Sequence, residues 1–323
     1  MNEYENADKK QQDIIDDIND YNKEEIGDVL GNTDSEPEDP KPPQKDVIEV
    51  GDIVTAEDIS KVEDKNDIYG EIVEGYDCEN NKGVRSWKLL YADSENVYLI
   101  ASNYIDIRYC PNGKNSTPID GYSNNLYMEN VIKDYNGSSD ITDERLKKLN
   151  EDYFNKYGSE NSTYKNMKAV AYMLDTSENV WGKFAGEKAE YAIGGPTIEL
   201  LFKSYNEKYK TNNKYQAEAK NRNGYLVSAD GGKNYTGMME NKEDFFNVSD
   251  ELYIVGEYYS VYNPFSLWIA SPACFDSFLC ALLYDGSISS LEYTFYSTGF
   301  RPVVCLKSDV QLEKLENGNF LIK

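Results

Sequence analysis

The chain of 323 residues contains no histidine. This absence removes the Ser-His-Asp and Cys-His arrangements of nucleophilic catalysis, histidine-based zinc sites and the commonest general base. We therefore expect no catalytic residue, no metal site and no cofactor.

Cysteine is scarce, and its spacing lacks a metal signature. The five cysteines lie at positions 78, 110, 274, 280 and 305, and none forms a C-x-x-C pair. An odd number cannot pair completely within one chain, so we expect most of them to be small buried apolar residues. One disulfide among Cys274, Cys280 and Cys305 is an alternative that the sequence does not decide.

Long apolar runs are also missing: no stretch approaches the ~20 residues of a membrane-spanning helix. The start, MNEYENADKK, is charged throughout, unlike a signal peptide. We expect no direct membrane insertion of this chain. Either the protein stays in the cytoplasm or an export segment lies upstream of this sequence.

Basic residues are outnumbered, with 33 Lys and Arg against 58 Asp and Glu, for a net charge of −25. Such a surface repels phosphate backbones and anionic lipids, which argues against nucleic acid and membrane surfaces as partners. Tyrosine is abundant, with 28 residues against 11 Phe and 3 Trp. Tyr suits a binding surface but also fills β-sheets well.

Composition divides the chain into three parts. Residues 1–30 predict an acidic amphipathic helix with Ile14, Ile15, Ile18 and Tyr21 on one stripe. Residues 31–45 are rich in Pro and acids and predict a flexible linker. The remainder, 46–323, is the expected folded domain.

The pattern of residues 46–323 predicts an α+β fold with an antiparallel sheet, because helical patterns lie in the middle and short strand patterns at both ends. The clearest hairpin spans 84–105. Helices are expected from Thr142 or Asp143, over 166–175, and after Gly194-Gly195 with Pro196 as the first helical residue. Further strands are expected from 224 onward, including 252–263, 267–272 and the closing residues. Gly-Gly-Pro does not match a phosphate-binding loop, since no Lys follows it.

The segment 274–296 predicts a second hairpin. Asp285-Gly286 is a favoured two-residue turn, and it implies the pairs Tyr284–Ser287, Leu282–Ser289, Cys280–Leu291 and Phe278–Tyr293 on one face. That face mixes apolar and polar residues. It suits either a half-exposed contact surface or an ordinary twisted sheet edge.

Three stretches resemble a known family: AVAYMLDTSENVWGKFAGEKAEYAIGGPTIELLFKSYNEKY, LWIASP and GFRPVVCLKSDVQLE. Over roughly 46–318 the chain resembles an uncharacterised family of gut-bacterial surface proteins. Their C-type-lectin-like domain belongs to the branch shared with formylglycine-generating enzymes and the variable proteins of diversity-generating retroelements. The resemblance implies a C-type-lectin-like fold with two or three helices. It also implies a fixed frame, Trp268–Pro272 and Gly299–Leu306, around a changeable segment at 274–296.

With the resemblance, the leading hypothesis is a non-enzymatic adhesion or binding protein at the cell surface, whose ligand is a protein or another cell-surface molecule. The residues expected to contact it are Phe275, Asp276, Phe278, Leu282, Tyr284, Asp285, Ser287, Ser289, Tyr293 and Tyr296. Arg301 is expected to clamp backbone carbonyls or form a salt bridge within the frame. The calcium and sugar motifs of true lectins do not occur in the sequence.

Two alternatives remain. The chain is a pilin-like or structural surface subunit if the helix at 1–30 mediates assembly. It is a cysteine enzyme, similar to the formylglycine-generating enzymes, if Cys274 acts with Cys280 or Cys305. The second alternative needs groups that stabilise a thiolate, and the sequence near these cysteines offers none.

Overall fold

The computed structural model describes residues 47–106, 109–111, 128–132, 135, 165–219, 222–228, 246–255, 266–272, 278–292 and 298–323. Within them the expected α+β class is confirmed: two mostly antiparallel sheets and a two-stranded ribbon are combined with few helices. The expected helix at 1–30, the linker at 31–45 and the helix after Thr142 lie outside the described residues.

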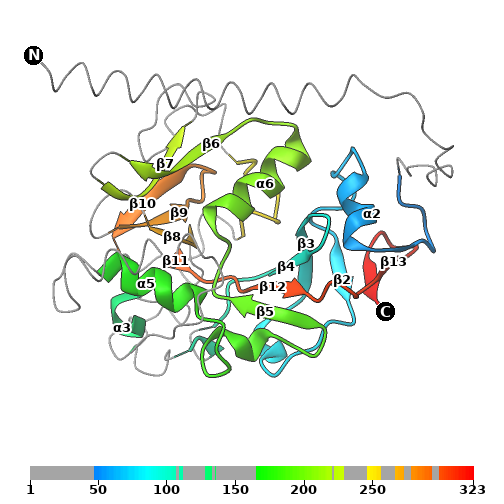
Figure 1. Cartoon of the computed structure of the whole chain (residues 1–323), viewed down its shortest axis with the longest axis horizontal. Helices are drawn as coiled ribbons and strands as arrows, with labels where there is room; N and C mark the ends of the chain where they lie inside the picture. Colours follow the sequence, from blue (N-terminus) through cyan, green and yellow to red (C-terminus); the bar gives the residue numbers. More distant parts are fainter. Residues whose placement is uncertain are drawn as a thin grey trace, which may run out of the picture. The chain divides into compact units, whose positions relative to one another are not determined.

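The larger sheet has eight strands in the order β1-β13-β14-β2-β3-β4-β12-β5 (Figure 1). Its strands are β1 Ile53–Val54, β2 Ile72–Glu74, β3 Trp87–Ala92, β4 Val97–Ala101, β5 Ala189–Ile193, β12 Val303–Leu306, β13 Leu312–Lys314 and β14 Phe320–Ile322. The hairpin expected at 84–105 is confirmed as β3 and β4. C-terminal strands lie between N-terminal ones, so both ends of the domain build one sheet.

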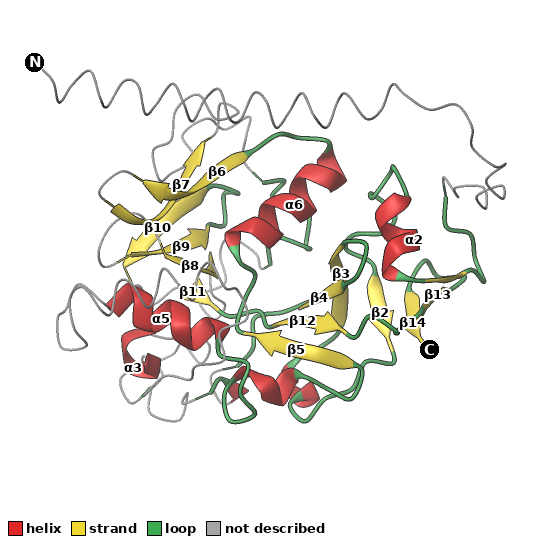
Figure 2. Ribbon diagram, viewed as in Figure 1, coloured by secondary structure: helices red, strands yellow, loops and turns green. Residues whose placement is uncertain are grey.

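The smaller sheet has four strands in the order β10-β9-β8-β11, and a separate ribbon joins β6 to β7 (Figure 2). These strands are β6 Lys214–Ala219, β7 Arg222–Ser228, β8 Ser266–Pro272, β9 Phe278–Leu282, β10 Ile288–Glu292 and β11 Thr298–Gly299. Strand β8 pairs antiparallel with β9 and parallel with β11. The first frame segment therefore lies between the hairpin and the start of the second frame segment.

Two helices support the smaller sheet. The helix expected over 166–175 is confirmed as α5, Lys165–Leu174, which contacts β8 and β9. Helix α6, Ile198–Tyr209, contacts β3, β6 and β8 and so touches all three sheets. Its buried side includes Ile198, Leu201, Phe202 and Tyr205.

The start of α6 differs from the expectation. The helix begins at Ile198, and Thr197 is its N-cap, with the hydroxyl accepting from the Leu200 amide. Pro196 was expected as the first helical residue and instead precedes the cap. A Thr hydroxyl satisfies an otherwise unpaired N–H of the first turn, which a proline ring cannot do.

Gly194 and Gly195 are explained by close packing. A Cβ on Gly194 would lie 2.4 Å from the Trp181 ring, and one on Gly195 would lie 2.8 Å from the Trp268 carbonyl oxygen. Both tryptophans are completely buried. The two glycines therefore let the chain pass close to the Trp181 ring and to the backbone of Trp268, where a Cβ would collide.

The remaining helical pieces are short: α2 Ala56–Lys61, η2 Asn81–Gly83, α3 Met128–Ile132 and η6 Trp181–Phe184. Helix α2 was not expected and begins at a capping box formed by Thr55 and Asp58. The strand expected over 252–263 is wrong for the part that is described, because residues 251–253 form a turn and residues 254–255 belong to no strand. Among the described helices, none is long and apolar enough to cross a membrane.

Arg301 is completely buried and joins strand β4 to the turn at residues 252–253. Its Nε donates to the Ala101 carbonyl oxygen at 2.7 Å, and its Nη1 donates to the carbonyl oxygens of Leu252 at 2.7 Å and Tyr253 at 3.3 Å. The expected carbonyl clamp is confirmed. Burial lowers the pKa of Arg301 to about 10, so the guanidinium still carries its charge at neutral pH.

Candidate functional site

The β9–β10 hairpin forms where it was expected, but its register is shifted by one residue. Leu282 pairs with Ile288, and Ala281 pairs with Ser289. The loop closes through the Leu283 amide, which donates to the Ser287 carbonyl oxygen at 2.8 Å. All four expected pairs are therefore wrong: Tyr284–Ser287, Leu282–Ser289, Cys280–Leu291 and Phe278–Tyr293. Cys280 pairs with Ser290, and Phe278 pairs with Glu292.

Gly286 causes the shift. Among residues 283–287, only Gly286 has a positive φ, +85°, and its amide donates to the Leu283 carbonyl oxygen at 3.0 Å. This is a three-residue loop that ends in a left-handed glycine. The expected two-residue turn would need positive φ at Asp285 as well, and Asp285 does not have it.

The shift divides the expected contact face, because a displacement of one residue moves side chains to the opposite face of a strand. Leu282 now shares a face with Ile288, while Ser289 shares the other face with Ala281. Leu282 is only 1% exposed and Ser287 6% exposed. Neither side chain is available to a ligand in this conformation, and Ser289 is half-buried.

The other expected contact residues divide into three groups. Tyr284 and Asp285 are exposed at the hairpin tip. Phe278 begins β9, and nothing is described of its side chain. The residues outside the described part of the chain are Phe275, Asp276, Tyr293 and Tyr296.

The tip has a defined internal structure. Asp285 Oδ1 accepts from the Ser287 amide at 3.0 Å and from the Ser287 hydroxyl at 2.7 Å. Such a local side-chain bond stabilises a turn. Tyr284, at 42% exposure, is directly before this aspartate. An aromatic ring and a carboxylate are thus presented together from an ordered loop.

A second turn, Phe246–Asp250, holds the tip. The Phe246 amide donates to the Gly286 carbonyl oxygen at 2.7 Å. A Cβ on Gly286 would lie 2.1 Å from the Phe246 carbonyl oxygen, so only glycine fits this approach. Phe246 itself is buried, with its ring centroid 4.1 Å from that of Tyr205 on α6.

Asp250 holds the second turn to α6. Its Oδ2 accepts from Lys208 Nζ at 2.7 Å and from the Tyr209 hydroxyl at 2.8 Å, while its Oδ1 accepts from the Leu252 amide at 2.9 Å. The Lys208 and Asp250 side chains are only 10% and 12% exposed. Asn247, Val248 and Ser249 are exposed between these two anchor points. Sequence reasoning missed this turn, although Asn-Val-Ser-Asp is a turn-forming composition.

Burial opposes thiolate formation at two of the described cysteines, Cys305 and Cys78. Burial raises the pKa of the Cys305 thiol to about 11, and the thiol donates to Asn96 Oδ1 at 3.5 Å. Burial likewise raises the pKa of Cys78 to about 11. Cys305, Cys78 and Cys110 are free thiols, and Cys280 is buried. A raised pKa opposes nucleophilic chemistry at neutral pH. Cys274 lies outside the described residues.

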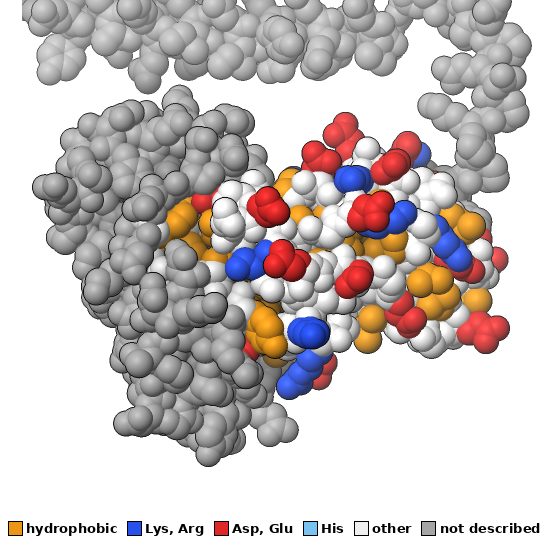
Figure 3. Space-filling view, turned by 90° about the horizontal axis from the view of Figure 1, so that it is seen from below, with side chains coloured by type: hydrophobic (Ala, Val, Ile, Leu, Met, Phe, Trp, Pro, Cys, Tyr) orange, Lys and Arg blue, Asp and Glu red, His pale blue; other side chains and the backbone are white. Residues whose placement is uncertain are grey.

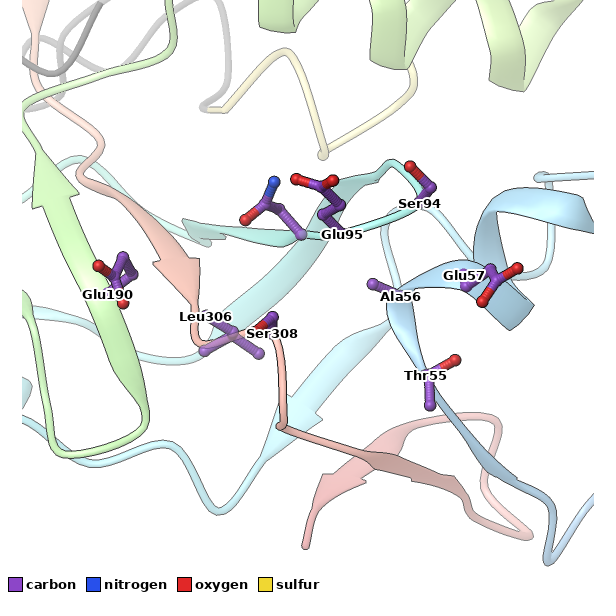
Figure 4. A pocket seen from close by; sticks show the side chains of 9 residues that line it. Thr55, Ala56, Glu57, Ser94, Glu95, Glu190, Leu306 and Ser308 are labelled. Atoms are coloured by element: carbon purple, nitrogen blue, oxygen red, sulfur yellow. The ribbon is translucent and has the colours of Figure 1, made fainter.

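A polar cleft of about 670 Å³ lies between α2 and the ends of β4, β5 and β12 (Figure 4). Its lining residues are Thr55, Ala56, Glu57, Ser94, Glu95, Asn96, Glu190, Leu306 and Ser308. The three glutamates come from different elements around the hollow, and Glu57 is paired with Lys61 at 2.6 Å. In the part of the chain that the structure describes, no group of three or more Cys, Asp or Glu side chains is arranged to hold a metal ion.

One face of the described surface is mixed in charge. On the face shown in Figure 3, acidic and basic side chains are interspersed, with apolar side chains between them.

The comparisons with known proteins found no match: no family model, no curated protein and no solved structure matches the chain.

Proposed function

We propose that the protein is a non-enzymatic binding protein that contacts a protein ligand through the tip of the β9–β10 hairpin. One observation carries the proposal: Tyr284 and Asp285 are exposed on a loop that is held by hydrogen bonds within the tip and to Phe246. Exposed aromatic side chains on a preorganised loop are typical of protein-binding surfaces, because little entropy is lost on association.

The arrangement of the frame supports the C-type-lectin-like interpretation, which we propose for residues 46–323. Strand β8, from the first frame segment, pairs with β9 on one side and with β11 on the other. Trp268 and Arg301 are completely buried. A rigid frame of this kind would tolerate changes in the segment 274–296, at positions whose side chains are exposed.

The resemblance also carries the proposed location, at the cell surface or outside the cell. Binding at such a surface requires no chemistry from the cysteines. A binding role without cysteine chemistry agrees with the raised pKa of the Cys305 thiol.

A selection of random linear peptides displayed on phage tests the proposal, with the immobilised full chain as the target. Selected peptides are then synthesised and measured against the wild type, Tyr284→Ala and the control Val50→Ala, which changes another exposed apolar residue. We expect Tyr284→Ala to weaken most peptides by about tenfold or more, as at a binding hot spot. Equal binding to wild type and Tyr284→Ala would refute the proposed function.

A further inference from the structure

We propose that the contact surface includes a second turn, and that it fits a basic protein segment in which an apolar side chain lies beside an Arg or Lys. The surface is formed by the turns Phe246–Asp250 and Leu283–Ser287, and its added contact residue is Val248. This inference rests on the proposed function and deepens it.

The two turns form one unit at their backbones. The hydrogen bond from the Phe246 amide to the Gly286 carbonyl joins them directly. The close approach at Gly286 leaves no room for a side chain between them. Because Phe246 and Asp250 are both anchored on α6, the residues between them are held beside the hairpin tip.

Val248 provides the apolar part of this surface. It is 54% exposed, and Tyr284 is 42% exposed. The other large apolar residues with comparable exposure in the described part of the chain are Val47, Val50 and Ile53, which belong to a separate segment. An exposed valine on an anchored turn loses little conformational freedom when a partner covers it.

The charge of the surface favours a basic partner. Neither turn contains Lys or Arg. The Asp250 carboxylate is already paired with Lys208, whereas Asp285 uses only Oδ1 within the tip, and its Oδ2 has no bond among the described residues. An Arg or Lys of the partner would bind Oδ2 and accelerate association electrostatically.

The exposure of these turns also favours a protein over a small molecule. Pockets for small molecules enclose most of the ligand surface, whereas Val248, Tyr284 and Asp285 are exposed side chains on two turns. Nucleic acid is disfavoured by the carboxylate and the overall charge of −25.

The selected phage peptides test the inference with two further variants and their controls. Val248→Ser is compared with Val50→Ser, and Asp285→Asn with Asp309→Asn, another exposed aspartate. Asparagine retains the Oδ1 acceptor, so Asp285→Asn keeps the turn bond to Ser287. Urea unfolding of each variant confirms that stability is unchanged.

We expect peptides enriched in Arg or Lys next to an apolar residue, with affinity reduced about fivefold or more by Val248→Ser and by Asp285→Asn. The controls should bind like the wild type, and Asp285→Asn should reduce the salt dependence of the association rate. If Tyr284→Ala weakens binding but Val248→Ser and Asp285→Asn do not, the inference is wrong and the proposed function stands. If Tyr284→Ala has no effect, the proposed function itself fails.

Discussion

The amide of Phe246 lies 2.7 Å from the carbonyl oxygen of Gly286, and this hydrogen bond ties two turns from distant parts of the sequence. Each turn has its own internal acceptor: Asp285 in the hairpin tip and Asn247 in the second turn. Because α6 holds Phe246 and Asp250, the position of the hairpin tip depends on a helix outside its own sheet.

Gly286→Ala is expected to destabilise the fold. The substitution places a Cβ 2.1 Å from the Phe246 carbonyl oxygen and imposes a left-handed backbone on alanine. We expect a loss of more than about 2 kcal/mol in the free energy of unfolding, measured by urea denaturation. Gly51→Ala is the matched control, because Gly51 has a similar φ of +87° and open space around it. It should lose only about 1 kcal/mol, and equal losses would show that the contact with Phe246 is not formed.

Asp250→Asn is expected to be costly because it leaves the Lys208 ammonium without its counter-ion in a nearly buried position. The loss should be about 3 kcal/mol in urea denaturation. The control is Glu63→Gln, which removes the carboxylate of the exposed Glu63–Lys210 pair at 3.7 Å and should cost less than about 0.5 kcal/mol. A small effect of Asp250→Asn would mean that the second turn is not anchored on α6 as described.

Asp285→Ala separates the structural role of this residue from its proposed binding role. Alanine removes the acceptor for the Ser287 amide and hydroxyl, and we expect a loss of about 1 kcal/mol in the free energy of unfolding. Asp285→Asn keeps that acceptor and should remain within about 0.5 kcal/mol of the wild type. If both variants unfold at the wild-type urea concentration, the aspartate does not stabilise the tip.

The Cys305 thiol should make stability fall at alkaline pH. Its pKa in the folded chain is about 11, raised by burial from an ordinary value of 9.0. Between these values the unfolded chain has lost the proton and the folded chain keeps it. The contribution is therefore fully present below pH 9 and is lost as the pH rises through 11.

Urea unfolding at pH 8, 9, 10 and 11 checks this prediction. The wild type should lose on the order of 2 kcal/mol more than Cys305→Ala over this interval. Equal slopes for the two proteins would contradict the buried, protonated state of Cys305. The same experiment at pH 8 should find the Cys305 thiol unreactive toward a thiol reagent until urea unfolds the chain.

The local sequence pattern was sufficient to predict several helices and strands. The pattern over 84–105 predicted the β3–β4 hairpin, and the pattern over 166–175 predicted helix α5. These signals are read within one element, where side-chain period and turn chemistry decide. The family resemblance implied a framework role for Arg301, and its three carbonyl contacts agree with the expected clamp.

The candidate site was predicted less well, for a specific reason. Asp-Gly is compatible with both a two-residue turn and a three-residue loop that ends in a left-handed glycine. The strand register of these two loops differs by one residue. The observed three-residue loop is the one in which the Phe246 amide donates to the Gly286 carbonyl oxygen. No local pattern around 285–286 contains that information, because Phe246 lies far away in the sequence.

An α+β class, the absence of histidine chemistry and a hairpin within 274–296 with a glycine at its turn could all be predicted from the chain's residues. These properties follow from residue types and their local spacing. The exposure of individual hairpin residues was set by tertiary packing. Packing buries Leu282 and Ser287, leaves Tyr284 and Asp285 in solvent, and brings Val248 onto a neighbouring turn. Exposure depends on what covers each side chain, and here the covering residues come from other parts of the chain.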